Sequence, residues 1–301
     1  MTRIELLRSF LDATKPGLEI GASHTPTCPK AAGFNVEILD HLDQAGLREK
    51  YRDHPIDPAI IEVVDHVWSG QSFKSLTGKP HGYAWVLASH VVEHTPDLIA
   101  FLNDCDDILT DDGVLVLAVP DKRFCFDHYR TKTSLAVVID AHFNARKVHS
   151  PGTAAEVYLN LCSTKGNWQT DGQPIEIWGN KDLALSMMSA SKRGEYVDMH
   201  AWAFTPASFR VILNDLFDLG LTKLREITFF DNSGHEFFCV FGRHGRGSGI
   251  PRTELLQKSL LEEGNQYRMV FDEQPLVSND TDRKEFGTSV SDTNLATTSN
   301  L

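Results

Sequence analysis

The sequence predicts an α/β protein with a doubly wound, mostly parallel sheet. Two apolar runs, 83–89 and 114–119, lack the alternation of a half-exposed strand and suit strands buried on both faces. A segment with helical spacing of its apolar residues, 97–109, lies between them. Strands that alternate with helices favour parallel pairing, with the helices packed on the sheet.

The earlier elements follow the same rhythm. Three strands are expected before 83–89, at 18–20, 35–40 and 61–68, together with helices over 3–12 and 43–51. Asp111-Asp112-Gly113 is expected to form a turn before the strand at 114–119.

The region 121–200 departs from this rhythm and is interpreted as an insertion with helices over 131–147 and 181–192. A helix then begins with Thr205 as its cap and Pro206 in its first turn. The strands 224–230 and 236–241 form a final antiparallel hairpin. We therefore expect one domain over 1–245 that contains the insertion. At 246–301 we expect a linker, a short helix over 254–263 and a disordered tail.

Composition narrows the partners and the compartment. The formal charge of −12 over 301 residues argues against nucleic acid, because phosphate contacts need clustered Lys and Arg. No apolar run is long enough to span a membrane, and the N-terminal segment lacks the apolar centre of a signal peptide. We therefore expect a cytoplasmic protein. The five scattered cysteines contain no CxxC pair, which disfavours a zinc knuckle or a disulfide framework.

The first candidate site begins at Glu19-Ile20-Gly21-Ala22-Ser23, where a buried strand ends in a glycine turn. Gly21 permits the turn and a close approach of the backbone to a ligand. Asp40 ends the next strand, the place for a carboxylate that binds ribose hydroxyls. Together they predict an adenosine-containing ligand; the alternative is an ordinary turn glycine with a solvated aspartate.

The residues after Gly21 discriminate between two adenosine-containing ligands, a dinucleotide and S-adenosylmethionine. A dinucleotide fingerprint needs further glycines so that the backbone can press against a pyrophosphate. This chain has Ser23 and Pro26 there. S-adenosylmethionine has no phosphate and carries an ammonium group, which Glu19 would favour directly or through water. The sequence therefore predicts S-adenosylmethionine as the cofactor and disfavours NAD.

The strand exit from Val86 to His94 resembles that of the class I S-adenosylmethionine-dependent methyltransferases, whose fourth strand often ends in a similar hxxEH pattern. A helix, a turn and a strand that ends in proline, here Pro120, follow in the family's order. The resemblance covers roughly 15–122 and 201–242 and implies a Rossmann-like fold and methyl transfer. The stretches LEIGAS, ASHVVEH and PDKRFCFDHYR also resemble a subgroup found with glycan and cell-envelope biosynthesis enzymes. That likeness implies a sugar or another small molecule as acceptor.

The resemblance also implies roles for particular residues. One departure from the family is that its GxGxG is reduced to Gly21-Ala22-Ser23, which puts the geometry of the loop in question. The resemblance implies that Gly21, Ala22 and Ser23 contact the methionine part of the cofactor and that Asp40 binds the ribose. Asp65, or the stretch 67–69 with Trp68, would border the adenine. Ser89 and His90 would lie beside the methionine part and the transferred methyl group.

The second candidate site is the run from Asp121 to Arg130, directly after the fifth strand. Methyl transfer to a hydroxyl needs a base near the attacking oxygen. His128 is a candidate base, and Asp127 or Asp121 would orient it or hold the substrate. The basic residues Lys122, Arg123 and Arg130 are candidates for holding an acceptor carboxylate or phosphate. The alternative is a charged surface loop.

Other polar and aromatic residues have two interpretations each. His200, where the insertion rejoins the fold, and His142 are either further bases or structural. His90, Glu93 and His94 invite a metal interpretation, but HVVEH lacks the HExxH spacing, so we expect a wall of the cofactor pocket and no metal. The tryptophans near the insertion form a sugar-stacking face or plain core: Trp168, Trp178 and Trp202.

The function expected from the sequence is O-methylation of a small-molecule or sugar hydroxyl by in-line displacement. Three alternatives stay open: a nitrogen acceptor, a carbon acceptor, and a protein of the same fold that binds the cofactor without catalysis. A homodimer also stays open.

Overall fold

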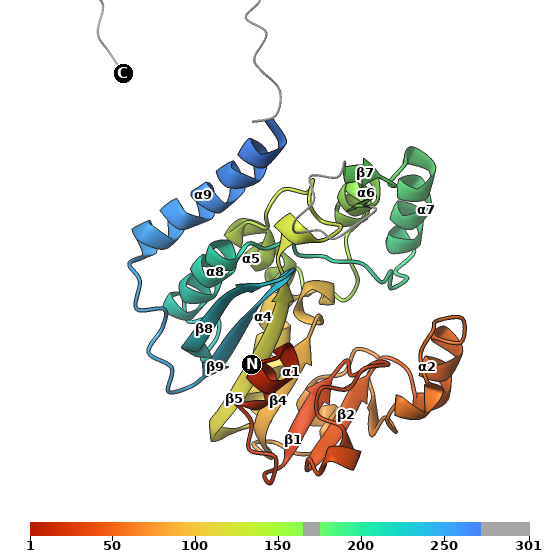
Figure 1. Ribbon diagram of the computed structural model, residues 1–301, viewed down its shortest axis with the longest axis vertical. Helices are drawn as coiled ribbons and strands as arrows, with labels where there is room; N and C mark the ends of the chain where they lie inside the picture. The colour runs from red at the N-terminus through yellow and green to blue at the C-terminus, as the bar shows by residue number, and fades with distance from the viewer. Residues whose placement is uncertain (165–174, 272–301) are drawn as a thin grey trace, which may run out of the picture.

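The computed structural model describes residues 1–164 and 175–271, which form a seven-stranded sheet flanked by helices (Figure 1). The strand order is β3-β2-β1-β4-β5-β9-β8; β9 pairs antiparallel with both β5 and β8, and the other pairs are parallel. The predicted fold class, a Rossmann-like, mostly parallel sheet with a C-terminal antiparallel pair, is confirmed. The strands are β1 (Gly17–Ile20), β2 (Val36–Asp40), β3 (His66–Val67), β4 (Tyr83–Ser89), β5 (Leu109–Pro120), β8 (Arg225–Ser233) and β9 (Glu236–Gly242).

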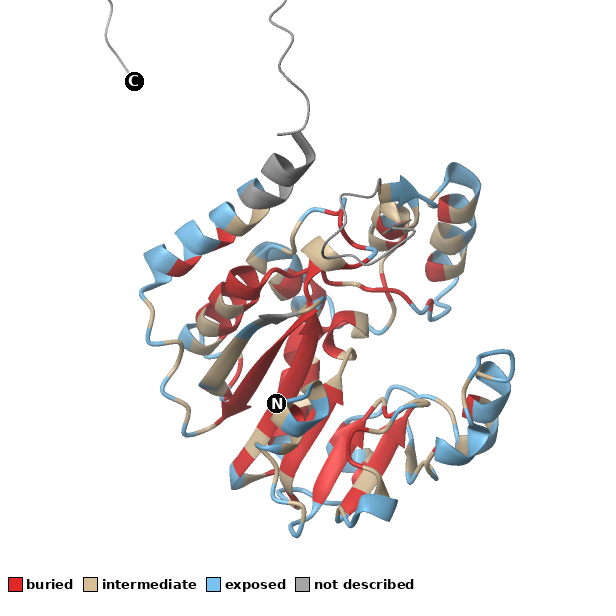
Figure 2. Cartoon of the chain, in the orientation of Figure 1, coloured by how far each residue is buried: buried red, intermediate tan, exposed pale blue. Residues whose placement is uncertain are grey.

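Two cores cover the two faces of this sheet, because successive strand residues point to opposite sides. Leu115 and Leu117 of β5 belong to the larger core, which Val116 and Ala118 do not join. The larger core is completed by α3 (Phe73–Thr77), α4 (Leu98–Ile108), α5 (Leu135–Phe143) and α8 (Pro206–Asp218). The smaller core is completed by α1 (Arg3–Arg8) and the loop after β1. The central strands are therefore buried along most of their length (Figure 2), which is why their sequences are continuously apolar.

Local capping sets several helix ends. Asp43 accepts the Gly46 N–H at 2.7 Å and begins α2 (Gln44–Lys50). Asp97 accepts the Ala100 N–H at 2.9 Å and begins α4. The predicted start of α8 is confirmed, with Pro206 in its first turn.

Several predicted boundaries in the first half of the chain are wrong. The first helix ends at Arg8, before residue 12. The third strand shrinks from 61–68 to His66–Val67, because the Asp65 carboxylate accepts the Ile38 N–H and so ends the ladder with β2. The turn expected at 111–113 lies inside β5, where the register between β4 and β5 shifts.

The insertion after β5 folds against itself. α6 (Pro151–Asn160) and α7 (Lys181–Lys192) pack around a small core that contains Ala154, Val157, Val197 and Met199. β6 (Cys162–Thr164) pairs with β7 (Ile175–Ile177). The helix expected over 181–192 is α7 and that expected over 131–147 is the shorter α5, whereas α6 was not expected.

The C-terminal helix α9 (Arg252–Phe271) is longer than the short helix expected over 254–263, and it packs on α8. Leu255 is buried, Arg252 pairs with Asp215 at 2.7 Å, and Glu262 accepts the Ala207 N–H. The segment expected to be a linker is held to β8 by a hydrogen bond from the Gly247 N–H to the Glu226 carbonyl. The tail expected to be disordered lies outside the described residues.

Within 1–164 and 175–271, four short 3-10 helices connect these elements: η1 (Lys30–Ala32), η2 (Pro58–Ile60), η3 (Val92–His94) and η4 (Lys122–Phe124). Among the helices that the structure describes, none combines the length and apolarity needed to cross a membrane.

Candidate active site at the carboxyl edge of the sheet

The strand order reverses between β1 and β4, and open α/β sheets bind ligands outside the carboxyl ends of the strands at such a point. Gly21 leaves β1 here with φ +69°. A Cβ on Gly21 would lie 2.6 Å from Val91 Cγ2, in the loop after β4. Glycine therefore serves both a left-handed turn and the close approach of the two loops.

Glu19 holds the loop that follows. It is 2 % exposed, and its two carboxylate oxygens accept the Thr27 N–H at 2.6 Å and the Cys28 N–H at 2.9 Å. Burial raises the pKa of Glu19, and these hydrogen bonds oppose the rise. Both carboxylate oxygens of Glu19 are thus already bound to backbone N–H groups of the loop. Glu19 therefore shapes the loop and does not offer a free oxygen to the ammonium group of a ligand.

Asp40 links the ends of β1 and β2. Its Oδ2 accepts the Ser23 N–H at 2.9 Å, and its Oδ1 lies 2.6 Å from His41 Nδ1. The carboxylate predicted to bind ribose and the loop predicted to bind methionine, from Gly21 through Ala22 to Ser23, are therefore in direct contact.

The two candidates for contact with the adenine, Asp65 and Trp68, lie at different positions relative to the carboxyl edge of the sheet. Asp65 precedes β3, and its carboxylate binds the Ile38 N–H and Lys30 Nζ at 2.8 and 2.7 Å, short of the carboxyl end of β2. Trp68 follows β3 directly and donates its backbone N–H to the Asp40 carbonyl at 2.8 Å. Trp68, and not Asp65, lies at the carboxyl edge beside Asp40.

The exit of β4 is held by two residues that the sequence analysis missed. Arg3 donates to Ser89 Oγ at 2.6 Å and to Glu236 Oε1 at 2.6 Å. Glu236 Oε2 lies 2.9 Å from Nε2 of His90, which has a left-handed backbone with φ +54°. Although burial opposes it, His90 and Arg3 lower the pKa of Glu236 to about 2. Only the sheet pairing reveals Glu236, because β9 places it opposite Pro120.

The loop after β5 does not pair its residues as expected. Asp121 is fully buried and binds Arg123 through both carboxylate oxygens. His128 has its Nδ1 2.8 Å from the Arg123 carbonyl, and burial lowers the pKa of His128. Asp127 lies with other partners, so it does not orient His128.

Asp127 instead joins the far end of the insertion. Its Oδ2 lies 2.5 Å from His200 Nδ1, and its Oδ1 accepts from Arg130 at 2.7 Å. Although full burial opposes it, His200 and Arg130 lower the pKa of Asp127 to about 2. Arg130 also donates to the His200 carbonyl at 2.8 Å, which locks the two segments together.

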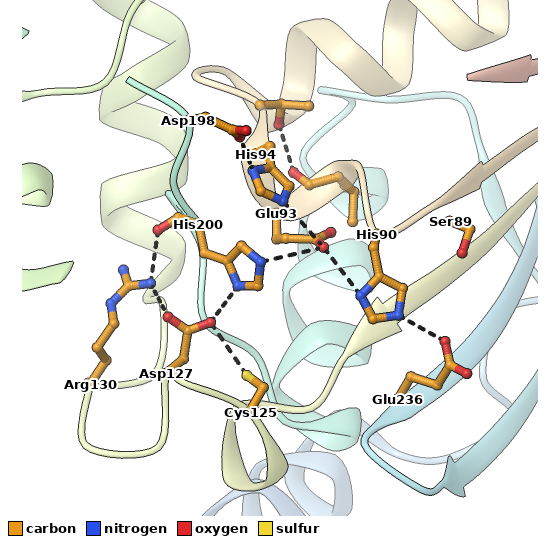
Figure 3. A network of polar contacts seen from close by, with 12 residues as sticks. Ser89, His90, Glu93, His94, Cys125, Asp127, Arg130, Asp198, His200 and Glu236 are labelled. Atoms are coloured by element: carbon orange, nitrogen blue, oxygen red, sulfur yellow. Dashed lines mark hydrogen bonds and ion pairs between the residues drawn. The ribbon is translucent and has the colours of Figure 1, made fainter. Parts of the chain in front are cut away.

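Glu93 lies at the centre of a group of three histidines (Figure 3). We call Glu93, His90, His94 and His200 the inner cluster. Glu93 Oε1 lies 3.7 Å from His90 Nδ1, 3.8 Å from His94 Nε2 and 3.7 Å from His200 Nε2. Glu93 is fully buried, and neither of its oxygens accepts a hydrogen bond from the described residues.

The remaining candidates lie outside this group. His142 Nδ1 is 3.0 Å from Asp97. Trp202 is buried in the larger core, whereas Trp178 is 61 % exposed on the insertion. Trp168 falls outside the described residues.

Comparison with known proteins returns similarity of fold only. No protein-family model matches the chain, and no curated protein matches it in sequence. Solved structures of similar fold include the CcbJ methyltransferase from Streptomyces caelestis, at 13 % identity and TM-score 0.42, with 79 % of this chain and 93 % of that chain covered. The CMeT domain of the citrinin polyketide synthase has 15 % identity and TM-score 0.38, with 80 % of this chain and 50 % of that chain covered, so this chain spans half its length. A Rhodobacter sphaeroides protein named among the Zn-dependent alcohol dehydrogenases has 12 % identity and TM-score 0.44, with 80 % and 88 % covered.

Proposed function

We propose that the protein transfers a methyl group from S-adenosylmethionine to an oxygen of a small-molecule or sugar acceptor. The observation that carries the cofactor assignment is the state of the backbone around the Gly21 turn. Its amides are largely used by the protein itself, while Asp40 stands at the end of the neighbouring strand.

A pyrophosphate would need backbone N–H groups in this turn and a helix N-terminus behind it. The Gly21 N–H donates to the Leu39 carbonyl at 2.8 Å, and the Ser23 N–H donates to Asp40. The amides of Thr27 and Cys28 are held by Glu19. A loop with the short η1 follows β1, where a dinucleotide fold has a full helix. These features favour an adenosine ligand without phosphates.

The bound cofactor would supply an activated methyl group on sulfur, and the protein's part is to hold and orient it. In this proposal Asp40 binds the ribose hydroxyls through Oδ1, with the His41 ring contact giving way and the hydrogen bond from the His41 N–H kept. The backbone from Gly21 to Ser23 lies along the methionine part. Trp68 borders the adenine, and Ser89 and His90 flank the methyl group.

The acceptor side would be formed by the inner cluster, the loop after β5 and the insertion. A hydroxyl must lose its proton when it is methylated, and histidine–carboxylate pairs at this edge suit that step. Two of the three cationic side chains predicted to hold an acceptor anion are paired with acids, Arg123 with Asp121 and Arg130 with Asp127. The third, Lys122, is buried and donates to the His128 carbonyl. This favours a neutral acceptor, such as a sugar hydroxyl, over a phosphate or a carboxylate.

Titration calorimetry with S-adenosylhomocysteine, and separately with NAD, tests the cofactor. We expect heat of binding with S-adenosylhomocysteine and none with NAD. The reverse result would exclude this proposal. Binding of S-adenosylhomocysteine without methyl transfer to any hydroxyl, amine or carbon acceptor in a broad screen would favour the non-catalytic alternative.

A further inference from the structure

We propose that Glu93, His94 and His200 form a binding site for one divalent first-row transition-metal ion of the Zn²⁺ class. One donor atom from each residue can be chosen so that all three lie within 4.8 Å of one another. Two imidazoles and one carboxylate make up a known protein ligand set for such ions, with further coordination positions left open. HVVEH lacks the HExxH spacing and so predicts no metal by itself, but the third ligand, His200, comes from the far end of the insertion.

Glu93 is buried without a hydrogen-bond partner among the described residues, which supports a bound cation. A fully buried carboxylate that accepts no hydrogen bond carries a large desolvation penalty. The nitrogens that face it, at 3.7–3.8 Å, are too far away for hydrogen bonds. A cation between Glu93, His94 and His200 would neutralise the carboxylate and give each of these side chains a partner.

The orientation of the imidazoles is the second, independent argument. The nitrogen of His200 that faces away from Glu93 is held by Asp127 at 2.5 Å, and that of His94 lies 2.9 Å from Asp198 as an ion-pair contact without hydrogen-bond geometry. A metal-binding histidine usually has its second nitrogen held by a carboxylate in this way, which directs the first nitrogen to the metal. His90 repeats the arrangement with Glu236 at 2.9 Å, beside the same oxygen of Glu93 (Figure 3).

A second group of donors shares His200 and is a weaker candidate. Cys125, Asp127 and His200 also lie close together. The Asp127 carboxylate there is already bound to Arg130 and His200. Burial raises the pKa of the Cys125 thiol well above its usual range, which disfavours the thiolate that a metal needs.

If the protein has the proposed function, a metal ion at this site would act on the acceptor. An open coordination position at the carboxyl edge would bind the acceptor's hydroxyl oxygen. The ion's charge would lower the pKa of that hydroxyl and so ease its deprotonation.

The test is metal binding by the full chain, with the purification tag removed and bound metal stripped by a chelator. Zn²⁺ is titrated by calorimetry, and bound metal is counted by elemental analysis after gel filtration. We expect one Zn²⁺ per chain. X-ray absorption of the Zn²⁺ protein should show nitrogen and oxygen ligands at about 2.0–2.2 Å and no sulfur at about 2.3 Å.

Four variants locate the site. Glu93→Gln and His200→Ala should each abolish stoichiometric binding. Asp127→Asn should retain the stoichiometry but weaken the affinity about 10- to 100-fold, because it only positions His200. The matched control is His142→Ala, which removes a histidine that also contacts an aspartate but lies outside the inner cluster. It should bind Zn²⁺ like the unaltered protein.

Three results would each contradict the proposed metal site. No bound Zn²⁺ in the unaltered protein, a sulfur ligand, or unchanged binding in both Glu93→Gln and His200→Ala would overturn the inference. If a variant fails to fold by circular dichroism, X-ray absorption of the unaltered protein still decides. Loss of S-adenosylhomocysteine binding with Zn²⁺ binding intact would count against the proposed function alone, and the converse against this site alone.

Discussion

Asp127 Oδ2 lies 2.5 Å from His200 Nδ1, although one residue follows β5 and the other ends the insertion. This contact turns the Nε2 of His200 toward Glu93, at 3.7 Å from Oε1. Of His200 and His128, only His200 therefore has a nitrogen that a carboxylate directs toward the inner cluster. Both histidines were candidate bases on sequence grounds. The contact between Asp127 and His200 makes His200 the stronger candidate.

Replacing the two histidines separately tests this ranking. His200→Ala should lower kcat about 100- to 10,000-fold and leave the affinity for S-adenosylhomocysteine nearly unchanged, because its imidazole lies on the acceptor side, where it would act as the base or, with a metal ion bound, hold the ion that eases deprotonation. His128→Ala should also lower turnover more than cofactor affinity, but less than His200→Ala does. Steady-state kinetics with calorimetry in parallel measures both quantities. An equal loss of turnover and affinity in either variant would indicate a structural role for that histidine.

Asp40→Ala should weaken S-adenosylhomocysteine binding at least about tenfold, since about 1.4 kcal/mol of binding free energy suffices for that factor and charged hydrogen bonds contribute more. Calorimetry measures the affinity, and thermal unfolding checks the fold. The control is Asp112→Ala, which removes an aspartate side chain that is 95 % exposed. Unchanged affinity in Asp40→Ala would mean that the ribose assignment is wrong.

Gly21→Ala and Gly33→Ala form a matched pair, because both glycines have positive φ, +69° and +87°. The left-handed backbone should cost either variant about 1–2 kcal/mol of unfolding free energy. Gly21→Ala should lose more, because its Cβ would meet Val91 Cγ2 at 2.6 Å, whereas open space surrounds Gly33. Only Gly21→Ala should lose S-adenosylhomocysteine binding. Denaturant unfolding gives the comparison, and equal losses would contradict the close approach of the two loops.

Glu236→Gln should lower stability in a pH-dependent way. The folded-state pKa of Glu236 is lowered from 4.5 to about 2, so the carboxylate contributes stability above the unfolded value and loses it as the pH falls through the folded value. The loss in Glu236→Gln should reach at most about 3 kcal/mol near pH 7 and shrink between about pH 4.5 and pH 2.

Urea unfolding at a series of pH values checks this expectation. Glu49→Gln is the control, because Glu49 forms an exposed pair with Arg52 and should contribute little at any pH. A loss in Glu236→Gln that does not vary with pH would show that the side chain's shape matters there, and not its charge.

The sequence alone determined the features that depend on neighbouring residues. The bounds of β4, the start of α8 at Pro206 and the extent of α7 were all predicted from apolar periodicity and capping. Asp40 was predicted at the end of β2 for the same reason, since the apolar run of the strand stops there. Such signals depend on neighbouring residues in the sequence, so they do not require knowledge of the tertiary contacts.

Only the tertiary structure decided which polar groups meet. Asp65 and Trp68 were alternative candidates for the adenine, and only Trp68 reaches the carboxyl edge, because the pairing of the two-residue edge strand β3 with β2 sets which of them lies there. Asp127 paired with His200 instead of His128, and Glu93 became the centre of three histidines, because loops after β4 and β5 and the end of the insertion converge at one edge of the sheet. No local pattern encodes such pairings: they depend on strand order, register and loop conformation across the whole chain.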